Sequence, residues 1–196
     1  MNDGKVSAQS VLDEYWQHRV DSIYLQVVRH LVTGVADSAS SLLDVGSAAC
    51  PYLEWYDWIP TRTSLDLRNP YTGPGVNSIR SDFLKWEPDR EYDVVTCLQV
   101  MEHVPAATEF AQKLLSVGKI VVVSLPYKWK AGNTSSHVHD PVDEEKVLDW
   151  FGRKPNYEYI AREVKSGARR IIHVYERDKD RRWPSTNVLR RMREQG

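Results

Sequence analysis

Acidic side chains stand at or just after the ends of three short segments in the first half of the chain. Asp44 lies in SLLDVG, Asp66 in TSLDL and Asp82 in VNSIRSDF. Gly46 and Asp66 are twenty residues apart, the spacing at which a carboxylate on a second strand reaches the ribose of a nucleoside held over the first strand-to-helix turn. A carboxylate suits a ribose diol because it accepts two hydroxyl protons in charge-assisted hydrogen bonds. Asp66 is therefore the candidate ribose ligand.

The turn after the first strand discriminates between nucleoside ligands. A dinucleotide pyrophosphate needs close backbone approach at several points, hence the spacing Gly-x-Gly-x-x-Gly. Here Gly46 is followed by SAACP, so one glycine remains, and Pro51 has no backbone N–H to offer. The turn therefore disfavours a nicotinamide dinucleotide and favours a nucleoside without phosphates.

Four segments, LLDVGSAAC, SLDL, RSDF and YDVVTCLQVMEHV, occur in the order found in the class I S-adenosylmethionine-dependent methyltransferases, which the chain resembles over about residues 40–177. The first motif of that family reads acid-x-Gly-x-Gly-x-Gly. Asp44 and Gly46 match its first half, whereas Ala48 and Cys50 replace its later glycines. These two residues are small enough to let the methionine part of the cofactor pass.

The resemblance implies S-adenosyl-L-methionine as cofactor. It implies that Asp66 holds the ribose, that Asp82 bonds the adenine amine with Phe83 against the ring, and that the run from Gln99 to His103 lines the floor of the pocket. The cofactor-binding residues expected on this basis are Asp44, Gly46, Ser47, Asp66, Leu67, Asp82, Phe83, Gln99 and Val100.

Three histidines are candidates for the catalytic base. A sulfonium methyl is already activated, so the protein mainly aligns the acceptor, but a hydroxyl acceptor must also lose its proton, and imidazole is suited to take it. His103 follows the strand that leads to Gln99, and His137 and His139 belong to the loop after the next strand. Both neighbourhoods are expected to face the cleft.

The loop over residues 127–140 has two further possible roles. Its HVHD run at 137–140 could bind a divalent ion, but histidines one residue apart point to opposite sides of an extended chain, and Pro141 indicates that the run precedes a helix. We therefore expect no metal site there and a role in covering or contacting the acceptor. Trp129 either stacks on a flat acceptor or a sugar, or anchors the loop.

The spacing of apolar residues predicts the elements that position these groups. Apolar runs predict strands over residues 41–46, 63–67, 76–83, 92–100, 119–126, 157–164 and 168–177. Helical periodicity and helix-end residues predict helices over residues 7–31, 51–59, 106–117 and 143–151. The alternation predicts a Rossmann-like three-layer α/β/α sandwich, with a mostly parallel seven-stranded sheet that ends in a C-terminal antiparallel hairpin.

Length and composition predict one domain. With 196 residues, we expect a single methyltransferase-like domain over residues 1–178, made of an N-terminal helical cap (1–34) and an α/β core (41–177), and then a basic extension over 179–196. The cap helix, ending at Thr33-Gly34, would roof the cofactor site, and the loop over 127–140 would form the acceptor side.

The charge balance and the apolar pattern limit the partners. Lys and Arg total 26 against 27 Asp and Glu, a net charge of -1, so neither nucleic acid nor a membrane is expected as partner. There is no long apolar stretch or signal-like N-terminus, and the two cysteines, Cys50 and Cys97, show no disulfide or zinc spacing. We expect a soluble, cytoplasmic protein; the oligomeric state is left open.

The sequence therefore leaves two main functional hypotheses. The first is a methyltransferase that acts on an oxygen of a small-molecule or carbohydrate (glycan) substrate. The second is a catalytically degenerate module of the same fold that binds a nucleoside or a partner, because Ala48 and Cys50 replace glycines. A nicotinamide-dependent oxidoreductase is disfavoured by the missing glycines.

Overall fold

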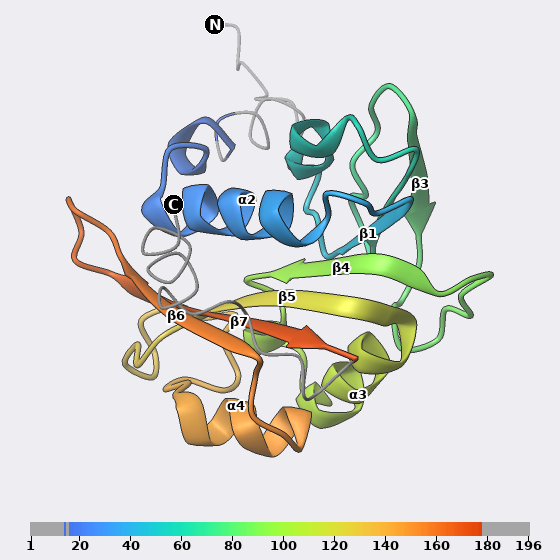
Figure 1. The fold of residues 1–196 in the computed structure, drawn as a ribbon. Helices are drawn as coiled ribbons and strands as arrows, with labels where there is room; N and C mark the ends of the chain where they lie inside the picture. The colour runs from blue at the N-terminus through green and yellow to red at the C-terminus, as the bar shows by residue number, and fades with distance from the viewer. Residues whose placement is uncertain (1–13, 15, 178–196) are drawn as a thin grey trace, which may run out of the picture.

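Seven strands form one sheet between two helical layers (Figure 1). The structure, a computed structural model, describes residues 14 and 16–177. The strands are β1 Ser41–Val45, β2 Thr61–Asp66, β3 Val76–Arg80, β4 Tyr92–Leu98, β5 Gly118–Pro126, β6 Tyr157–Arg162 and β7 Arg169–Glu176. Their order is β3-β2-β1-β4-β5-β7-β6, parallel from β3 to β5, with β7 antiparallel to both β5 and β6. The predicted fold class is confirmed, including the C-terminal hairpin.

Successive residues of the central strands serve opposite faces of the sheet. Leu43 on β1 and Val95 on β4 pack in the core on one side, whereas their neighbours Leu42 and Val94 pack in the core on the other. Because both faces are covered, these strands are continuous apolar runs rather than alternating ones. β3 lies at the edge and is only partly buried, as its weaker apolar pattern predicts.

Helices cover both faces of the sheet. α2 Ile23–Val35 and the 3-10 helix η1 Tyr52–Tyr56 lie on one side, and α3 Ala107–Val117 and α4 Glu144–Phe151 lie on the other (Figure 1). A short 3-10 helix, η2 Met101–His103, follows β4. α4 begins after Asp143, whose carboxylate accepts a hydrogen bond from the Lys146 N–H, the usual arrangement of a helix N-cap.

The predicted N-terminal helix is interrupted, and it ends later than expected. Residues 16–19 are helical, the chain turns at residues 20–21, and α2 runs from Ile23 to Val35 instead of ending at Thr33-Gly34. The carboxylate of Glu163, from the β6–β7 hairpin, accepts hydrogen bonds from the Ile23 and Tyr24 N–H groups at 2.9 and 3.2 Å. This distant cap starts a new helix because it satisfies N–H groups that a continuous helix would bond internally. The expected start at Ser7 and the extension over 179–196 lie outside the described residues.

The helix expected over residues 51–59 was wrong in type and length. The structure has a 3-10 helix over Tyr52–Tyr56, with Pro51 just before it. Only eight residues separate Pro51 from Pro60, and Pro60 disfavours helical backbone at Ile59 before it, so the helical segment stays short. The 3-10 geometry stacks residues three apart, which brings Tyr52 and Trp55 together against Trp16 at ring distances of 5.3 and 5.4 Å.

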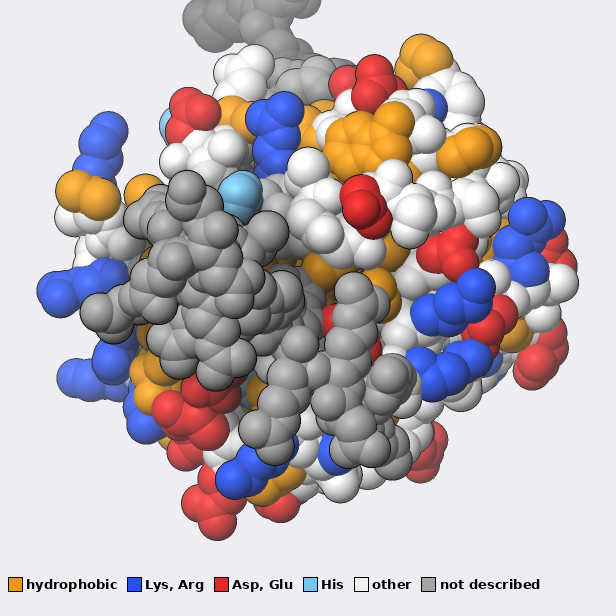
Figure 2. All heavy atoms as spheres, viewed as in Figure 1, with side chains coloured by type: hydrophobic (Ala, Val, Ile, Leu, Met, Phe, Trp, Pro, Cys, Tyr) orange, Lys and Arg blue, Asp and Glu red, His pale blue; other side chains and the backbone are white. Residues whose placement is uncertain are grey.

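The surface of the described residues carries charges of both signs. On the face shown in Figure 2, Lys and Arg side chains alternate with Asp and Glu, without a large area of one sign. Within residues 14 and 16–177, no helix combines the length and apolar character needed to cross a bilayer.

Candidate functional site

The carboxyl ends of the parallel strands bring the predicted site residues to one edge of the sheet. The chain moves outward from β1 to β2 and β3 on one side, and from β4 to β5 on the other, so the order reverses between β1 and β4. Ligands of open α/β sheets bind at such a reversal. Asp44, Asp66 and the run from Gln99 to His103 all lie at this edge.

Asp44 is a buried carboxyl group with spare hydrogen-bonding capacity. Its Oδ1 accepts a hydrogen bond of 2.6 Å from the Thr96 hydroxyl of β4, and its Oδ2 has no partner among the described residues. The side chain is 1% exposed, and this burial raises the pKa of Asp44 to about 7. A buried acceptor without a partner is costly, so Asp44 is suited to receive a cationic or hydrogen-donating ligand.

Gly46 occupies a position that excludes a side chain. Its φ is +82°, and a Cβ built on it would lie 2.4 Å from Cγ2 of Val100, so Val100, two residues after β4, packs directly against the first turn. Ala48 and Ala49 follow with φ of 48° and 59°, the left-handed region that disfavours residues with a Cβ. The turn keeps a backbone path suited to glycine although two alanines occupy it.

We expect Gly46→Ala to destabilise the protein by about 2–3 kcal/mol, since strain from the positive φ adds to overpacking against Val100. Gly132→Ala is the matched control because Gly132 has φ +85° and nothing within 4 Å of a built Cβ; it should cost only about 1 kcal/mol. Urea denaturation measures both. Adding Val100→Ala should recover part of the Gly46→Ala loss beyond its own effect. Equal losses in the two glycine variants would show that the contact with Val100 carries no energy.

Asp66 organises two loops through its carboxylate. Its Oδ1 accepts hydrogen bonds from the Arg68 and Asn69 N–H groups at 2.7 and 2.8 Å, and its Oδ2 accepts one from the Ala48 N–H at 3.0 Å. A carboxylate has about four lone-pair sites, so one is left for a ribose hydroxyl. The predicted ribose ligand is therefore also a structural residue.

The first turn and the loop after β2 are joined by further hydrogen bonds. The Ser47 and Ser64 hydroxyls lie 2.8 Å apart, and both accept from the Tyr71 N–H. The Ala49 N–H donates to the Asn69 carbonyl at 2.6 Å. In this arrangement Ser47 is buried and packs within the protein, so its predicted contact with the cofactor stays a prediction.

The residues expected around the adenine are divided between surface and core. Asp82 accepts a hydrogen bond from the Leu84 N–H at 3.0 Å and so closes a local turn. Phe83 is buried against Phe110, with ring centroids 4.8 Å apart. Leu67 is 59% exposed, which leaves an apolar side chain next to Asp66 open to a ligand. The adenine assignments of these residues stay predictions.

Gln99 links the site to the C-terminal hairpin. Its φ is +59°, its Nε2 donates to the Ser124 hydroxyl at 3.3 Å, and its Oε1 accepts from Arg170 Nε at 3.2 Å. Arg170 also contacts Glu163 at 3.4 Å, the same carboxylate that caps α2. Gln99 after β4, Arg170 of β7 and the first residues of α2 are therefore linked through this edge of the sheet.

His103 and His137 lie together, although 34 positions separate them in the chain. Their ring centroids are 4.8 Å apart. His103 Nδ1 is 2.9 Å from the Ser136 carbonyl oxygen and His137 Nδ1 is 2.7 Å from Asp140 Oδ2. A carbonyl oxygen only accepts, so Nδ1 of His103 carries a proton and donates, which leaves the Nε2 lone pair free in the neutral ring.

His139 is turned away from that pair. Its Nε2 is 2.8 Å from the Val104 carbonyl oxygen, and its ring packs on Trp150 with centroids 5.0 Å apart. The prediction that the neighbouring histidines face opposite sides is confirmed. His137 and His139 therefore do not share a ligand, and Asp140 serves as hydrogen-bond acceptor for His137.

Trp129 anchors the loop over residues 127–140. Its indole N–H donates to the Arg169 carbonyl at 2.9 Å, and its ring stacks on His137 with centroids 5.7 Å apart. The loop is further held by the Val138 N–H, which donates to the Glu102 carbonyl at 2.9 Å. Of the two roles left open for this tryptophan, anchoring is observed.

Glu102 is the functional candidate that sequence reasoning did not single out. It is 1% exposed, its Oε2 has no partner among the described residues, and burial raises its pKa to about 8. The available signal was an acid next to Met101, directly after an apolar strand, because a buried charge without a structural partner is expensive.

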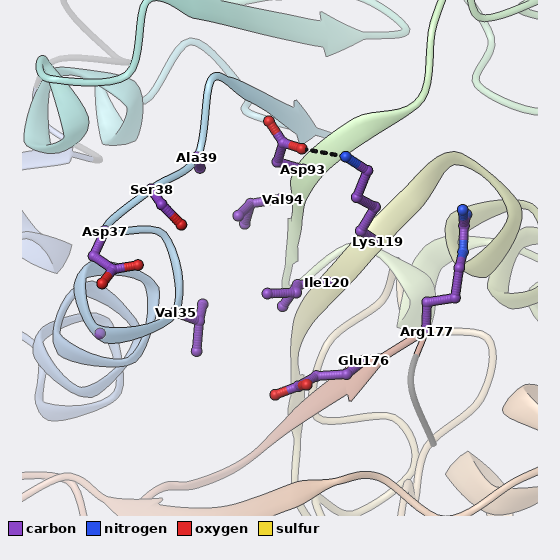
Figure 3. A pocket seen from close by; sticks show the side chains of 11 residues that line it. Val35, Asp37, Ser38, Ala39, Asp93, Val94, Lys119, Ile120, Glu176 and Arg177 are labelled. Carbon is purple, nitrogen blue, oxygen red and sulfur yellow. Dashed lines mark hydrogen bonds and ion pairs between the residues drawn. The ribbon is translucent and has the colours of Figure 1, made fainter. Parts of the chain in front are cut away.

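Two surface hollows lie at the opposite edge of the sheet. The larger, of about 570 Å³, is lined by the amino ends of β4 and β5 and the end of α2 (Figure 3). There Lys119 Nζ contacts Asp93 Oδ1 at 2.7 Å, so these two charges are paired. The second, of about 440 Å³, lies beside the start of β5 and Gly152. Neither holds the predicted site residues.

Comparisons with known proteins agree with this geometry. No protein-family model and no curated protein matches the sequence. Among solved structures, a 1,6-didemethyltoxoflavin-N1-methyltransferase of Burkholderia thailandensis, with bound 1,6-didemethyltoxoflavin and S-adenosylhomocysteine, is similar with a TM-score of 0.66 and 12% identity over 85% of this chain and 84% of its own. The chain has the class I methyltransferase fold.

Two further methyltransferases show the same fold. The N-methyltransferase NodS of Bradyrhizobium japonicum, in complex with S-adenosylhomocysteine, has a TM-score of 0.60 and 12% identity over 82% of this chain and 90% of its own. CalS10 of Micromonospora echinaspora, an amino pentose methyltransferase with bound S-adenosylmethionine, has a TM-score of 0.56 and 13% identity, and the match covers 84% of this chain and 96% of CalS10. At these identities the methyltransferase fold is what the structures share with this chain.

Proposed function

We propose that the protein is an S-adenosyl-L-methionine-dependent methyltransferase that methylates an oxygen of a small-molecule or carbohydrate acceptor. The observation that carries this proposal is the meeting of Asp44, Asp66 and the His103–His137 pair at the carboxyl edge of a methyltransferase-fold sheet. The first two residues are suited to a cationic nucleoside, and the pair is suited to an acceptor that must lose a proton.

The residues at this edge fit the cofactor in charge and hydrogen-bonding capacity. S-adenosyl-L-methionine supplies a methyl group on positively charged sulfur, which departs as a neutral thioether. Asp44 Oδ2 and Glu102 Oε2 are buried acceptors without a partner among the described residues, so an approaching cation would be favoured there. Asp66 has one lone-pair site left for a ribose hydroxyl, and release of its bond to the Ala48 N–H would free a second.

His103 is the histidine best placed to take the proton of an acceptor hydroxyl. Its Nδ1–H donates to the Ser136 carbonyl, and this hydrogen bond fixes the orientation of the ring and of the Nε2 lone pair. In His139, by contrast, Nε2 already contacts the Val104 carbonyl oxygen. The hydroxyl proton would pass to His103 Nε2 while the oxygen bonds the methyl carbon and the carbon–sulfur electron pair returns to sulfur. Orientation of acceptor and methyl donor can contribute up to about 7–11 kcal/mol to lowering a transfer barrier.

The acceptor class rests on the chemistry of the His103 side of the site. Two of the similar structures are named as N-methyltransferases and one as an amino pentose methyltransferase, so an amine acceptor is the direct competitor of a hydroxyl. A neutral amine already has its nucleophilic lone pair, whereas a hydroxyl gains from a base. The histidine pair therefore favours the oxygen acceptor.

Thermal melting with two ligands tests the proposal. S-adenosylhomocysteine near saturation should raise the melting temperature, and NAD should not, because only a ligand that binds the folded state stabilises it. Labelled cofactor is then offered to a metabolite extract and to sugars to find the methylated product. A shift with NAD alone would overturn the proposal.

Asp66→Asn should weaken S-adenosylhomocysteine binding by about 10- to 150-fold, the equivalent of about 1.5–3 kcal/mol for hydrogen bonds to a charged group. The asparagine keeps one oxygen for the Arg68 and Asn69 N–H groups, so the loop after β2 is retained. The charge is lost, together with the hydrogen bond from the Ala48 N–H, which an amide NH2 cannot accept. Isothermal titration calorimetry measures the affinity, with Asp89→Asn, an exposed acid paired with Arg90, as the matched control. Unchanged affinity in Asp66→Asn would remove the ribose role.

A second candidate function is a binding module that has lost transfer. The hydrogen bonds that join the first turn to the loop after β2, including Ala49 N–H to Asn69 O, favour it, because a nucleoside has to fit beside a turn already bonded to Asp66. This module would bind a nucleoside or a partner protein and yield no labelled product in the extract.

A further inference from the structure

Three side chains of metal-ligand type converge from two segments of the chain. Glu102 and His103 belong to η2 after β4, and His137 belongs to the loop before α4. One nitrogen or oxygen from each of the three lies within 4.8 Å of the other two. Sequence reasoning considered a different set, the HVHD run, which the structure divides between two directions.

Both imidazoles are held as metal-bound histidines are held. A ligating histidine usually donates its second ring N–H to a carboxylate or a backbone carbonyl, which orients the ring. Here Nδ1 of His137 contacts the Asp140 carboxylate at 2.7 Å, and Nδ1 of His103 contacts the Ser136 carbonyl at 2.9 Å. The Nε2 atoms are the ones left to bind an ion.

The three groups do not satisfy one another. Glu102 Oε1 is 4.0 Å from His103 Nε2, too long for a hydrogen bond, and Glu102 Oε2 has no partner among the described residues. The Glu102 side chain is 1% exposed and that of His137 is 6% exposed. A buried carboxyl group facing two imidazoles without a bond between them costs stability unless something binds there.

We propose that Glu102, His103 and His137 form a binding site for a first-row divalent transition-metal ion. Two imidazoles and one carboxylate suit ions such as Zn²⁺, Co²⁺ or Fe²⁺, whereas Mg²⁺ and Ca²⁺ prefer oxygen ligands. Ligands bound at about 2.0–2.2 Å lie at most about 4.4 Å apart, so the side chains must draw together on binding. The His103 side chain is 39% exposed and has room to turn.

Three protein ligands leave coordination positions open, as in catalytic zinc sites. This role rests on the proposed function. The ion would bind the acceptor's hydroxyl oxygen and lower the pKa of that hydroxyl, as zinc does for bound water. With an ion bound, His103 Nε2 is a ligand, and the ion replaces it as the group that activates the hydroxyl. The hydroxyl proton would then leave to solvent, the oxygen would bond the methyl carbon, and the carbon–sulfur pair would return to sulfur.

The test is direct ion binding by the full, untagged chain after treatment with a chelator, without cofactor or acceptor. Titration with Co²⁺ should give the visible absorption band of a Co²⁺ ion with low coordination number, and calorimetry should show one Zn²⁺ per chain and much weaker Mg²⁺ binding.

His103→Gln, at a half-exposed position that does not endanger folding, should weaken Zn²⁺ binding by more than about tenfold, as should Glu102→Gln. Asp140→Asn, which keeps one oxygen, should weaken it by about 10- to 100-fold through the orientation of His137. His30→Gln, on the exposed face of α2, is the matched control and should bind as the wild type does.

Absence of stoichiometric Co²⁺ and Zn²⁺ binding by the wild type, or binding that is unchanged in His103→Gln, would overturn the site. Because binding is read without cofactor, failure here leaves methyl transfer untouched, and failure of methyl transfer leaves the ion site untouched. Transfer that is lost with the chelator and restored by Zn²⁺ or Co²⁺ would support the role in acceptor activation. Undiminished transfer by the chelated protein would overturn that role.

Discussion

Replacing His103 by alanine should reduce methyl transfer by about 10²–10⁴-fold, the usual contribution of a positioned proton acceptor. The loss should appear in kcat, because His103 faces the acceptor side and makes no contact with Asp44 or Asp66, the candidate cofactor ligands. Transfer of labelled methyl to the acceptor found in the extract measures turnover, and calorimetry with S-adenosylhomocysteine measures cofactor affinity separately.

Two comparisons make the His103→Ala result specific. His30→Ala, on the exposed face of α2, should transfer as the wild type does. His139→Ala separates the neighbouring histidines, since its ring nitrogen is bonded to the Val104 carbonyl. A large loss in His139→Ala together with an active His103→Ala would move the catalytic role to His139.

Asp44→Asn should remove a pH-dependent contribution of about 4 kcal/mol from the free energy of unfolding. Burial raises the folded pKa of Asp44 from 3.8 to about 7, so between these values the folded chain keeps a proton that the unfolded chain has released. The free energy of unfolding contributed by Asp44 therefore falls as pH rises from about 4 to about 7 and is level above that. Asparagine keeps the acceptor for Thr96 and does not titrate.

The difference between the wild type and Asp44→Asn isolates this group. Glu102, whose pKa burial also raises, and His173, whose pKa burial lowers, are present in both proteins and cancel. Urea denaturation at several values between pH 4 and pH 8 should show the wild type losing stability relative to the variant as pH rises. A constant difference across this range would mean that Asp44 is ionised in the folded protein throughout.

Local patterns were sufficient to predict the fold. β1, β4 and β5 are buried on both faces, and the apolar runs of β4 and β5 are rich in β-branched residues. Asp44 and Asp66, near the ends of β1 and β2, located the ligand edge. The link from α2 to Glu163 was beyond reach, because residues about 140 positions apart form it. The same holds for the approach of His137 to His103, which depends on how the loop over 127–140 closes.

Only part of the chemistry of the site could be predicted, because the rest depends on backbone geometry and on contacts between distant segments. The glycine-poor turn pointed to a ligand without phosphates, but its left-handed alanines and the hydrogen bonds from Asp66 to neighbouring loops depend on backbone geometry that residue types do not specify. Glu102 could be recognised as a candidate ligand only from the structure, which places His137, from a distant segment, beside it.

A crystal structure of the protein grown with S-adenosylhomocysteine tests the central claim most directly. We predict the nucleoside over the first turn, with a ribose hydroxyl within hydrogen-bond distance of an Asp66 carboxylate oxygen and the sulfur facing the His103–His137 pair. A nucleoside bound elsewhere, or an Asp66 carboxylate still bonded only to backbone N–H groups at saturating ligand, would contradict it.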